Sequence, residues 1–334
     1  MSDQHIRALI EQCGLGTIEG TVLPVSGGLM HKMYKVCTTS GTYAVKCLNP
    51  EIMSRPDAMN NYSEAEKLER ILEDNGLPVV TAMSFNGKKM LSEGGGYYYI
   101  FHWQEGRITG FNGITKEQCF TAGTLLGRIH RIDVHEAEAE EPELSEVDFT
   151  SLLESARKRE STIVQVLEEN ITLLEDAQKR LNEARKNLPA ISVLSDDDMD
   201  PKNIMWHDGN AYIIDLECLG YSNPVSSCLN LALQWSGTVT GEFSKDNMEA
   251  FFMGYLQAYD NGFRSYDRIF GIAYTWIEWL EYNIRRALGM VSSDAEEMKL
   301  GETETLNTVG RIGYLSSMEE DICSVLRSLP NCSR

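Results

Sequence analysis

The segment of the sequence best suited to chemistry is a run of acidic residues between two apolar stretches. Four of five consecutive positions are aspartates, namely Asp196, Asp197, Asp198 and Asp200. Carboxylates this close repel one another, so we expect a metal ion, a substrate or basic side chains to compensate their charge. Pro201 forbids a continuing helix. The sequence therefore predicts an acidic loop.

A β-hairpin is predicted directly after this loop. Asp208-Gly209 is a strong signal for a two-residue turn. Such a turn pairs residue 207 with 210 and residue 203 with 214. Asn203 then lies beside Asp215 at the open end of the hairpin, and it follows Asp198 by five positions. Spacing alone therefore gathers Asp198, Asn203 and Asp215 in one place.

This set of side chains fits phosphoryl transfer. That reaction needs a carboxylate that orients or deprotonates the attacking hydroxyl, and an amide plus a carboxylate that hold Mg²⁺ on the phosphates. Asp198 would take the first role, and Asn203 and Asp215 the second. The alternative is a solvated acidic loop and a buried Asp215 whose carboxylate is satisfied by the backbone.

Two other metal-binding patterns fit the acidic loop less well. An EF-hand loop starting at Asp196 would need Gly and Glu where the sequence has Pro201 and His207. The spacing of Asp196, Asp197 and Asp200 also matches helical prenyl-diphosphate enzymes. The acids of those all-α enzymes belong on a long helix, whereas here a proline and a strand pair follow.

A kinase also needs a lysine on a strand and a carboxylate to orient it, and the N-terminal part offers both. Lys46 lies in the predicted strand 42–48, which is apolar on both faces, so the lysine needs a partner. Glu64 lies on the apolar face of the predicted helix 60–73, whereas Glu66 points elsewhere. We therefore expect Glu64 to pair with Lys46. The alternative is an edge lysine and a solvated glutamate.

A glycine-rich turn precedes the lysine strand. Ser26, Gly27 and Gly28 join two predicted strands, and such a turn lets backbone amides approach phosphate closely. The sequence contains neither G-x-x-x-x-G-K-[ST] nor G-x-G-x-x-G, so Walker and Rossmann sites are excluded.

The periodicity predicts an α+β fold with two lobes. A small antiparallel sheet with one or two helices occupies residues 1–102, which form the nucleotide-binding lobe. Residues 103–334 form a larger, mostly helical lobe for catalysis and acceptor binding, with a helical insert at about 136–188. The predicted strands are 21–25, 31–38, 42–48, 79–84, 97–103, 204–206 and 211–216, and the predicted helices are 3–13, 60–73, 116–132, 149–188, 226–234, 245–259, 266–288 and 305–329.

Composition limits the partners and the compartment. The net charge of −20 over 334 residues disfavours nucleic acid and membrane surfaces and favours cationic partners. The longest apolar stretch near the C-terminus, residues 270–280, is broken by Glu278 and is too short to cross a bilayer. Eight cysteines without a C-x-x-C pair indicate reduced thiols. We expect a cytoplasmic protein, and the sequence leaves its oligomeric state open.

With these motifs in place, the chain resembles the aminoglycoside phosphotransferase and choline kinase family, which has the protein-kinase-like fold. The resemblance runs from about residue 23 to residue 235. It implies that Ser26, Gly27 and Gly28 are the nucleotide loop, that residues 44–46 are the lysine strand and that residues 125–130 are the helix ending in Leu-His. It also makes Phe101, His102 and Trp103 the hinge that contacts the nucleotide.

Two positions depart from the pattern of that family. The loop of the family reads His-Gly-Asp, whereas this chain has Asp196-Asp197-Asp198. An aspartate usually found three residues after the proline of an Asp-Pro pair is Ser227 here. Both positions are architectural rather than chemical. The set Lys46, Asp198, Asn203 and Asp215 is complete, which argues against a pseudokinase.

The resulting expectation is a small-molecule kinase that uses ATP or GTP with Mg²⁺ to phosphorylate a hydroxyl. Acidic residues and aromatic rings favour a cationic acceptor, for which Asp200, Glu278, Trp279 and Tyr282 are candidate contacts. An aminoglycoside-like antibiotic is the first candidate, which would make the protein an antibiotic-resistance enzyme. Choline, another amino alcohol and a sugar metabolite are alternatives, as is a nucleotide-binding pseudokinase that acts through its helical insert.

Overall fold

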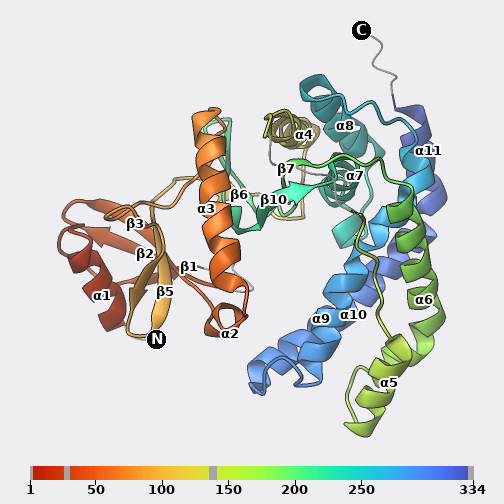
Figure 1. The fold of residues 1–334 in the computed structure, drawn as a ribbon, viewed down its shortest axis with the longest axis horizontal. Coiled ribbons are helices and arrows are strands. Elements are labelled where there is room, and N and C mark those ends of the chain that lie inside the picture. Colours follow the sequence, from red (N-terminus) through yellow and green to blue (C-terminus); the bar gives the residue numbers. More distant parts are fainter. Residues whose placement is uncertain (1–2, 26–30, 135–140, 330–334) are drawn as a thin grey trace. The chain divides into compact units, whose positions relative to one another are not determined.

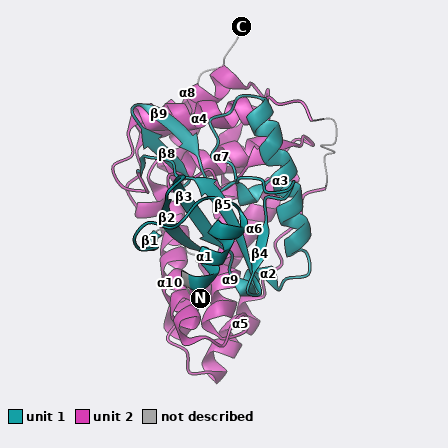
Figure 2. Ribbon diagram, turned by 90° about the vertical axis from the view of Figure 1, so that its left-hand side faces the viewer, with its two compact units in different colours: residues 1–108, 203–220 teal, residues 109–202, 221–334 magenta. Residues whose placement is uncertain are grey.

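The computed structural model describes residues 3–25, 31–134 and 141–329. The chain folds into two compact units, each built from two segments (Figure 2). The first unit contains residues 1–108 and 203–220, and the second contains residues 109–202 and 221–334. The predicted boundary lies after residue 102, whereas the first unit extends to residue 108 and also includes residues 203–220.

The first unit is organised around an antiparallel sheet with the strand order β1-β2-β3-β5-β4. Its strands are β1 (Leu23–Val25), β2 (Lys32–Thr38), β3 (Gly41–Cys47), β4 (Leu91–Glu93) and β5 (Gly96–His102), and its helices are α1 (Asp3–Gln12), α2 (Pro50–Met53) and α3 (Ala58–Asp74). Figure 1 shows α1 on one side of this sheet and α3 on the other. The small sheet lobe expected from the sequence is confirmed.

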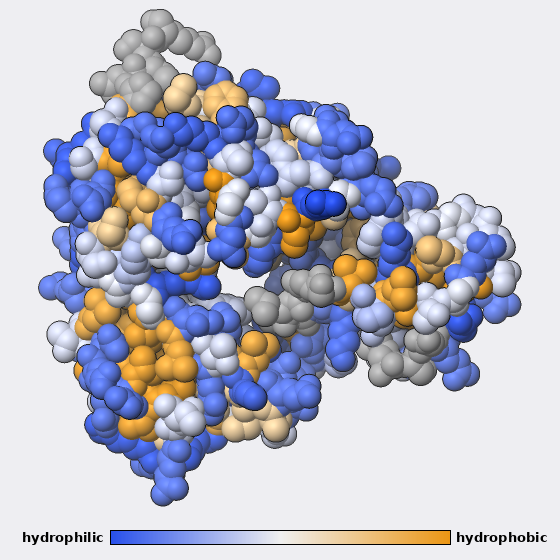
Figure 3. Space-filling model, turned by 180° about the vertical axis from the view of Figure 1, so that it is seen from behind, coloured by the Kyte–Doolittle hydropathy of each residue, from blue (hydrophilic) through white to orange (hydrophobic). Residues whose placement is uncertain are grey.

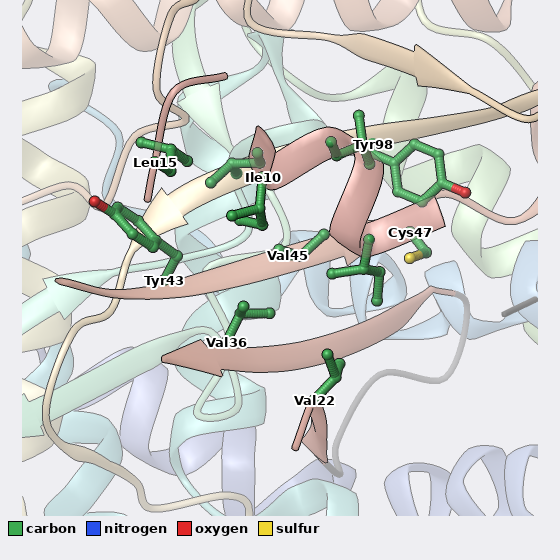
Figure 4. Packing of buried hydrophobic residues seen from close by; sticks show 11 residues of the cluster. Ile10, Leu15, Val22, Val36, Tyr43, Val45, Cys47 and Tyr98 are labelled. Carbon is green, nitrogen blue, oxygen red and sulfur yellow. The ribbon is translucent and has the colours of Figure 1, made fainter. Parts of the chain in front are cut away.

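Side chains alternate between the two faces of this sheet. On the α1 face, Val36 of β2 and Val45 of β3 pack with Ile10 in one buried cluster (Figure 4). On the other face, Tyr62 of α3 packs with Tyr99 of β5. Because Lys46 follows Val45, it belongs to the α3 face, on which the site is built.

A second, three-stranded sheet completes the first unit. Its order is β6 (Arg107–Ile108), β8 (Ile204–His207) and β9 (Asn210–Ile213). The register of the β8–β9 hairpin is the expected one, from the pair His207 and Asn210 to the pair Ile204 and Ile213. A 3₁₀ turn, η1 (Leu216–Cys218), follows the hairpin.

The predicted strand 79–84 is not a strand in the structure. Val80 N donates to Ile213 O at 2.9 Å, whereas Met83 N donates to Ile100 O at 2.7 Å. The segment therefore bonds to two different partners and builds a ladder with neither. The short β4 was not predicted, because three residues beside a run of glycines carry little periodicity.

The second unit is mostly helical, as expected. Its elements are α4 (Lys116–His130), α5 (Phe149–Lys158), α6 (Val164–Lys186), β7 (Val193–Asp196), α7 (Pro224–Trp235), η2 (Thr238–Thr240), α8 (Lys245–Ala258), η3 (Tyr266–Thr275), α9 (Trp276–Ala287), α10 (Ala295–Ser317) and α11 (Glu319–Ser328). Strand β10 (Leu219–Ser222) pairs with β7. Glycines let α4 and α8 approach closely, since a Cβ on Gly123 would lie 2.0 Å from the Phe251 carbonyl oxygen.

Three predicted helices are divided in the structure. The predicted helix 305–329 covers the end of α10 and all of α11, which are separated at Met318. The tract 149–188 breaks into α5 and α6 because Glu160 adopts a φ of 51°, which a helix cannot accommodate. The predicted helix 266–288 begins as η3 and becomes α-helical only at Trp276, after a kink at Ile269. The expected stripe of α6, which includes Leu174, Ala177 and Leu181, is buried.

The polarity of the surface and the apolar character of the helices both fit a chain rich in charged residues. Hydrophilic residues cover most of the face shown in Figure 3, and hydrophobic residues form separate patches. Within residues 3–25, 31–134 and 141–329, no helix combines the length and the apolar character that crossing a bilayer requires.

Candidate active site

The centre of the site in the first unit is Lys46, which bonds to two carboxylates. Its Nζ lies 2.6 Å from Asp215 Oδ1 and 2.6 Å from Glu217 Oε1. Lys46 is buried, and burial alone would lower its pKa. The two carboxylates outweigh burial and raise the pKa of Lys46 above its ordinary value, so the lysine stays charged.

Asp215 reaches the lysine because the hairpin ends in an unusual backbone conformation. The turn residues Asp208 and Gly209 have φ values of 48° and 79°, as a two-residue hairpin turn requires. Ile214 N donates to Asn203 O at 2.9 Å and closes the open end of the hairpin. Asp215 then adopts φ 62° and ψ 60°, a left-handed conformation that is rare outside glycine and concentrates at functional sites.

Glu217 links the lysine to a wider polar network. Its carboxylate lies 2.9 Å from His31 Nε2 and accepts a hydrogen bond of 3.2 Å from the Tyr62 hydroxyl. Burial would raise the pKa of Glu217, but the hydrogen bond and charge of His31, together with Lys46, lower it to about 2. The carboxylate is therefore ionised and shares the charge of Lys46 with Asp215.

The partner predicted for Lys46 is wrong. Glu64 is exposed and bonds to Lys67, one turn further along α3. Glu66 instead accepts a hydrogen bond of 2.8 Å from the Tyr99 hydroxyl. Glu66 lies beside the buried face of α3, and Glu64 lies away from it. The residues of that face include Tyr62, Ala65, Leu68, Glu69 and Leu72.

Lys46, Glu66, Tyr99 and Asp215 line one small cavity of about 30 Å³. That volume has room for one or two water molecules and no more. The cavity is therefore a small pocket beside Lys46 and is too small to hold a whole nucleotide.

The predicted hinge residues lie at the end of β5, which pairs with β3. Phe101 lines the same small cavity, and His102 contacts the ring of Tyr43 at 5.7 Å. Trp103 N donates to Thr42 O, and the Nζ of Lys35 lies 4.0 Å from the centre of the Trp103 ring. The predicted nucleotide-loop residues Ser26, Gly27 and Gly28 lie outside the described residues.

The acidic loop lies in the second unit, after β7, and hydroxyl groups surround one of its aspartates. Asp197 Oδ1 accepts hydrogen bonds from Ser195 at 2.7 Å, from Ser222 at 3.1 Å and from Ser227 at 2.6 Å. Ser227 is the position where the resembled family has aspartate. Here the carboxylate belongs to Asp197 of the loop and the hydroxyl to Ser227 of α7, and their hydrogen bond connects the loop to the helix.

Backbone and basic groups compensate the rest of the acidic run. Asp200 N donates to Asp198 O at 2.7 Å, which turns the chain sharply at the predicted base. Asp200 Oδ2 lies 3.0 Å from Lys202 Nζ. Trp235 Nε1 donates to Met199 O at 2.9 Å and anchors the loop on α7.

His130 holds the start of the loop from α4. Its Nε2 lies 3.0 Å from Ser195 Oγ, and its Nδ1 lies 2.9 Å from the Tyr255 hydroxyl. Burial lowers the pKa of His130 to about 3, so the ring is neutral near neutral pH. A neutral ring with a partner on each nitrogen acts as a structural anchor.

Comparison with known proteins decides the family. The model of the phosphotransferase enzyme family matches residues 21–268, which is well over half of the chain. The chain belongs to this family. No curated protein sequence matches it.

Solved structures share the fold of this phosphotransferase. Spectinomycin phosphotransferase APH(9)-Ia, solved with ADP and spectinomycin, has a TM-score of 0.67 at 14% identity, covering 95% of this chain and 99% of that chain. Plasmodium vivax ethanolamine kinase has a TM-score of 0.57 at 17% identity, covering 87% and 81%. Amicoumacin kinase hAmiN, solved with AMP-PNP, Ca²⁺ and Ami, has a TM-score of 0.60 at 14% identity, covering 99% and 96%. The α+β, protein-kinase-like fold expected from the sequence is confirmed.

The residues predicted to contact the acceptor are engaged with other side chains of the phosphotransferase. Glu278 lies 2.6 Å from Arg185 Nη1, and Asp200 is paired with Lys202. Trp279 stacks on Tyr282 with ring centres 5.6 Å apart, and its Nε1 donates to Glu304 at 3.4 Å. These contacts occupy much of the negative charge on which the expectation of a cationic acceptor rested.

The predicted magnesium ligands fit a partly hydrated ion. Among the described residues, no three His, Cys, Asp or Glu side chains form a group that could hold a metal ion. Magnesium in phosphotransferases is commonly bound by only one or two carboxylates, with waters and substrate phosphates completing the shell. The carboxylate of Asp215, 40% exposed, and the amide of Asn203 are suitable ligands of this kind.

Sequence reasoning missed the network around Glu217. Glu217 could have been predicted, since it follows Asp215 by two positions. A strand lysine with two acidic neighbours needs no third acid from α3. His31 and Tyr62 carried no such signal, because their roles depend on tertiary contacts alone.

Proposed function

We propose that this phosphotransferase moves the γ-phosphoryl group of ATP, or of GTP, to a hydroxyl of a small molecule. The observation that carries the proposal is the pair of Lys46 and Asp215, whose atoms lie 2.6 Å apart although their positions in the chain differ by 169. A phosphate-binding lysine beside a carboxylate suited to Mg²⁺ is the arrangement that phosphoryl transfer uses.

Each of the predicted residues has a distinct task in this reaction. Lys46 binds the phosphates, and Asn203 and Asp215 hold Mg²⁺, which neutralises charge on the phosphates when bound. Asp198 receives the hydroxyl of the acceptor and takes its proton as the hydroxyl oxygen bonds to the γ-phosphorus. The bond from that phosphorus to the bridging oxygen breaks, and the nucleoside diphosphate leaves. Because the transition state is loose, positioning and charge neutralisation contribute more than proton abstraction.

Two further observations support the use of a nucleotide and a divalent ion. The similar spectinomycin phosphotransferase was solved with ADP, and the similar amicoumacin kinase was solved with AMP-PNP and Ca²⁺. The predicted hinge, Phe101, His102 and Trp103, would contact the purine. The nucleotide loop would be Ser26, Gly27 and Gly28.

The test is replacement of Asp198 by asparagine. We expect Asp198→Asn to lower the rate of acceptor phosphorylation at least about 100-fold, because the base is lost, while nucleotide affinity changes by no more than a few-fold. ADP release would be measured over aminoglycosides, amino alcohols, sugars and hydroxy acids. Asp208→Asn, the same change at the exposed hairpin turn, is the matched control. Unchanged turnover in Asp198→Asn would refute the proposed role.

A further inference from the structure

The second unit contains a cavity of about 400 Å³ that the site described above does not use. One side of it is formed by η2 and Gly241, and the other by Asn307, Gly310, Arg311 and Tyr314 of α10. Its volume is within the range of small-molecule binding sites, about 300–1,000 Å³. No carboxylate is among its lining residues.

Among the residues that the structure describes, Arg311 is the only charged one that lines this cavity. The guanidinium lies 4.5 Å from the centre of the Trp276 ring, and its Nε donates a long hydrogen bond of 3.4 Å to Val239 O. Among residues 3–25, 31–134 and 141–329, no carboxylate lies within ion-pair distance of Arg311. A guanidinium has five N–H donors, so most of its capacity to bind an anion is unused.

Three other arginines of this unit each have a carboxylate partner. Arg185 pairs with Glu278, Arg285 with Glu281 and Arg286 with Glu297. Burial lowers the pKa of Arg311, and the more distant charges of Glu304 and Asp200 only partly offset that effect. In a chain with a net charge of −20, a half-buried arginine without an acidic partner is an exception that needs an explanation.

Gly310 lines the cavity at an exposed position of α10. A Cβ at Gly310 would meet no atom within 4 Å, so packing does not require glycine there. By contrast, a Cβ at Gly301 of the same helix would lie 2.5 Å from Ala287 N. Glycine inside a helix costs about 1 kcal/mol relative to alanine. Because Gly310 is one of the lining residues, a side chain added there would reduce the open space beside it.

The cavity also lies near the acidic loop. Trp235, which precedes η2 by three positions, donates its Nε1 to Met199 O of the loop at 2.9 Å. Asp200 N donates to the backbone oxygen of Asp198, so the two aspartates belong to one tight turn. A molecule held at Arg311 would therefore have the base, Asp198, within the same region of the second unit.

We propose that this cavity binds the acceptor of the phosphotransferase through an anionic group, a carboxylate or a phosphate ester, held by the guanidinium of Arg311. This inference rests on the proposed function, in which Asp198 receives the acceptor hydroxyl. The Tyr314 hydroxyl accepts from Phe243 N at 3.0 Å, so its own proton is available to the same anionic group. The acceptor class is then a hydroxy acid or a phosphorylated polyol, not a polyamine.

The first experiment measures binding without catalysis. Matched probes would be titrated by calorimetry into the full chain: glycerate and glycerol 3-phosphate against glycerol, gluconate against glucose, and ethanolamine and kanamycin as cations. We expect at least one anionic probe to bind at least tenfold more tightly than its neutral counterpart. The glycerate and glycerol 3-phosphate arms distinguish a carboxylate from a phosphate. Tighter binding of the cations than of every anionic probe would overturn the proposal.

Variants then locate the site. Arg311→Gln should remove the advantage of the anionic probe, and Arg311→Lys should retain part of it, since it keeps the charge without the planar fork. Arg285→Gln, an exposed arginine outside the cavity, should have no effect. Gly310→Ala should weaken probe binding several-fold, whereas Gly313→Ala on the same helix should not. An advantage that survives Arg311→Gln would overturn the proposal.

A third measurement separates this inference from the proposed function. Asp198→Asn should bind the anionic probe as the wild type does but should not phosphorylate it. Wild-type chain that binds the probe through Arg311 and never releases ADP with it would overturn the assignment of this cavity to the acceptor. Wild-type chain that phosphorylates only cationic compounds, with rates unaffected by Arg311→Gln, would overturn the anionic acceptor while leaving the proposed transfer intact.

Discussion

At the scale of single residues, Lys46 is neutralised by two carboxylates from the same short segment. Asp215 and Glu217 each lie 2.6 Å from its Nζ. The two acids have different surroundings, because Glu217 is held by His31 and Tyr62 whereas Asp215 is 40% exposed. Glu217 is therefore suited to hold the lysine, and Asp215 is free to exchange its contact with the lysine for one with a metal ion.

This division of roles predicts the effect of Asp215→Asn. Asparagine adopts positive φ readily, so the backbone at this position should be preserved. Lys46 would still be neutralised by Glu217, so the first unit should remain folded. We expect Mg²⁺-dependent ATP affinity to fall at least about tenfold, because one charged ligand is lost. Titration calorimetry with and without Mg²⁺ measures this. An equal affinity with the metal present would contradict the assignment.

His130 predicts a pH dependence of stability. Its pKa is about 3 in the folded chain and about 6.5 when unfolded, so the unfolded chain binds more protons between these values. The free energy of unfolding should therefore fall as the pH drops below about 6.5 and continue to fall toward about 3. We expect a loss of about 1.4 kcal/mol between pH values near 7.5 and near 5.5, measured by urea unfolding.

His130→Gln provides the control, since an amide can bond to Ser195 and Tyr255 without titrating. It should be less stable near pH 7.5, and its stability should depend less on pH. Identical pH slopes for the two proteins would show that His130 is not the group responsible.

The chemistry of single residues was predictable where residue type and spacing sufficed. Lys46 and Asp215 were found because a lysine in an apolar strand and an aspartate at the end of a hairpin need partners. Glu64 was misassigned because Leu68 and Ile71 alone do not fix the phase of α3. Tyr62 and Glu69 belong to the buried face as well, but a tyrosine and a glutamate are not residue types from which a buried position is predicted. The unpaired charge of Arg311 could not be read from the sequence.

At the scale of elements, glycine positions control how closely helices pack. A Cβ at Gly123 would lie 2.0 Å from the Phe251 carbonyl oxygen, so α4 and α8 would have to separate. We expect Gly123→Ala to lower the free energy of unfolding by about 1–3 kcal/mol. In Gly313→Ala the nearest atom to the new Cβ is Leu173 Cδ2 at 3.8 Å, so this variant should be stabilised by up to about 1 kcal/mol. Urea unfolding compares the two, and equal signs would contradict the explanation.

Elements with strong local signals were predicted accurately. The β8–β9 hairpin has the predicted register because the turn residues Asp208 and Gly209 determine it. The break at Glu160 was not predictable, since no glycine or proline marks it. Helix α10 starts at Ala295, ten positions before the predicted start at 305, because its first turns are polar and Asp294 caps them by accepting from Glu296 N and Glu297 N.

At the scale of the whole molecule, the first unit depends on a segment that is distant in sequence. Strand β6 pairs with β8, Ile213 bonds to Pro78, and Lys46 bonds to Asp215. We expect a fragment of residues 1–108 to be unstable, whereas the same fragment joined to residues 203–220 by a linker of about four residues should fold. The pairing of Ile108 with Met205 brings the two ends close enough for such a linker.

Near-ultraviolet circular dichroism and urea unfolding would compare the two fragments. A linked fragment carrying Gly209→Val, which opposes the positive φ of the turn, is the control and should be less stable than the linked parent. A native-like fragment of residues 1–108 alone would show that the hairpin is dispensable.

The split of the first unit between two segments also has a consequence for protein synthesis. When residue 108 leaves the ribosome, neither of the acids that pair with Lys46 has been translated. Residues 109–214 must be translated before the first of those acids exists, which takes roughly 5–20 s at ordinary elongation rates. During that interval the first unit cannot complete its fold, and its apolar residues stay open to chaperones.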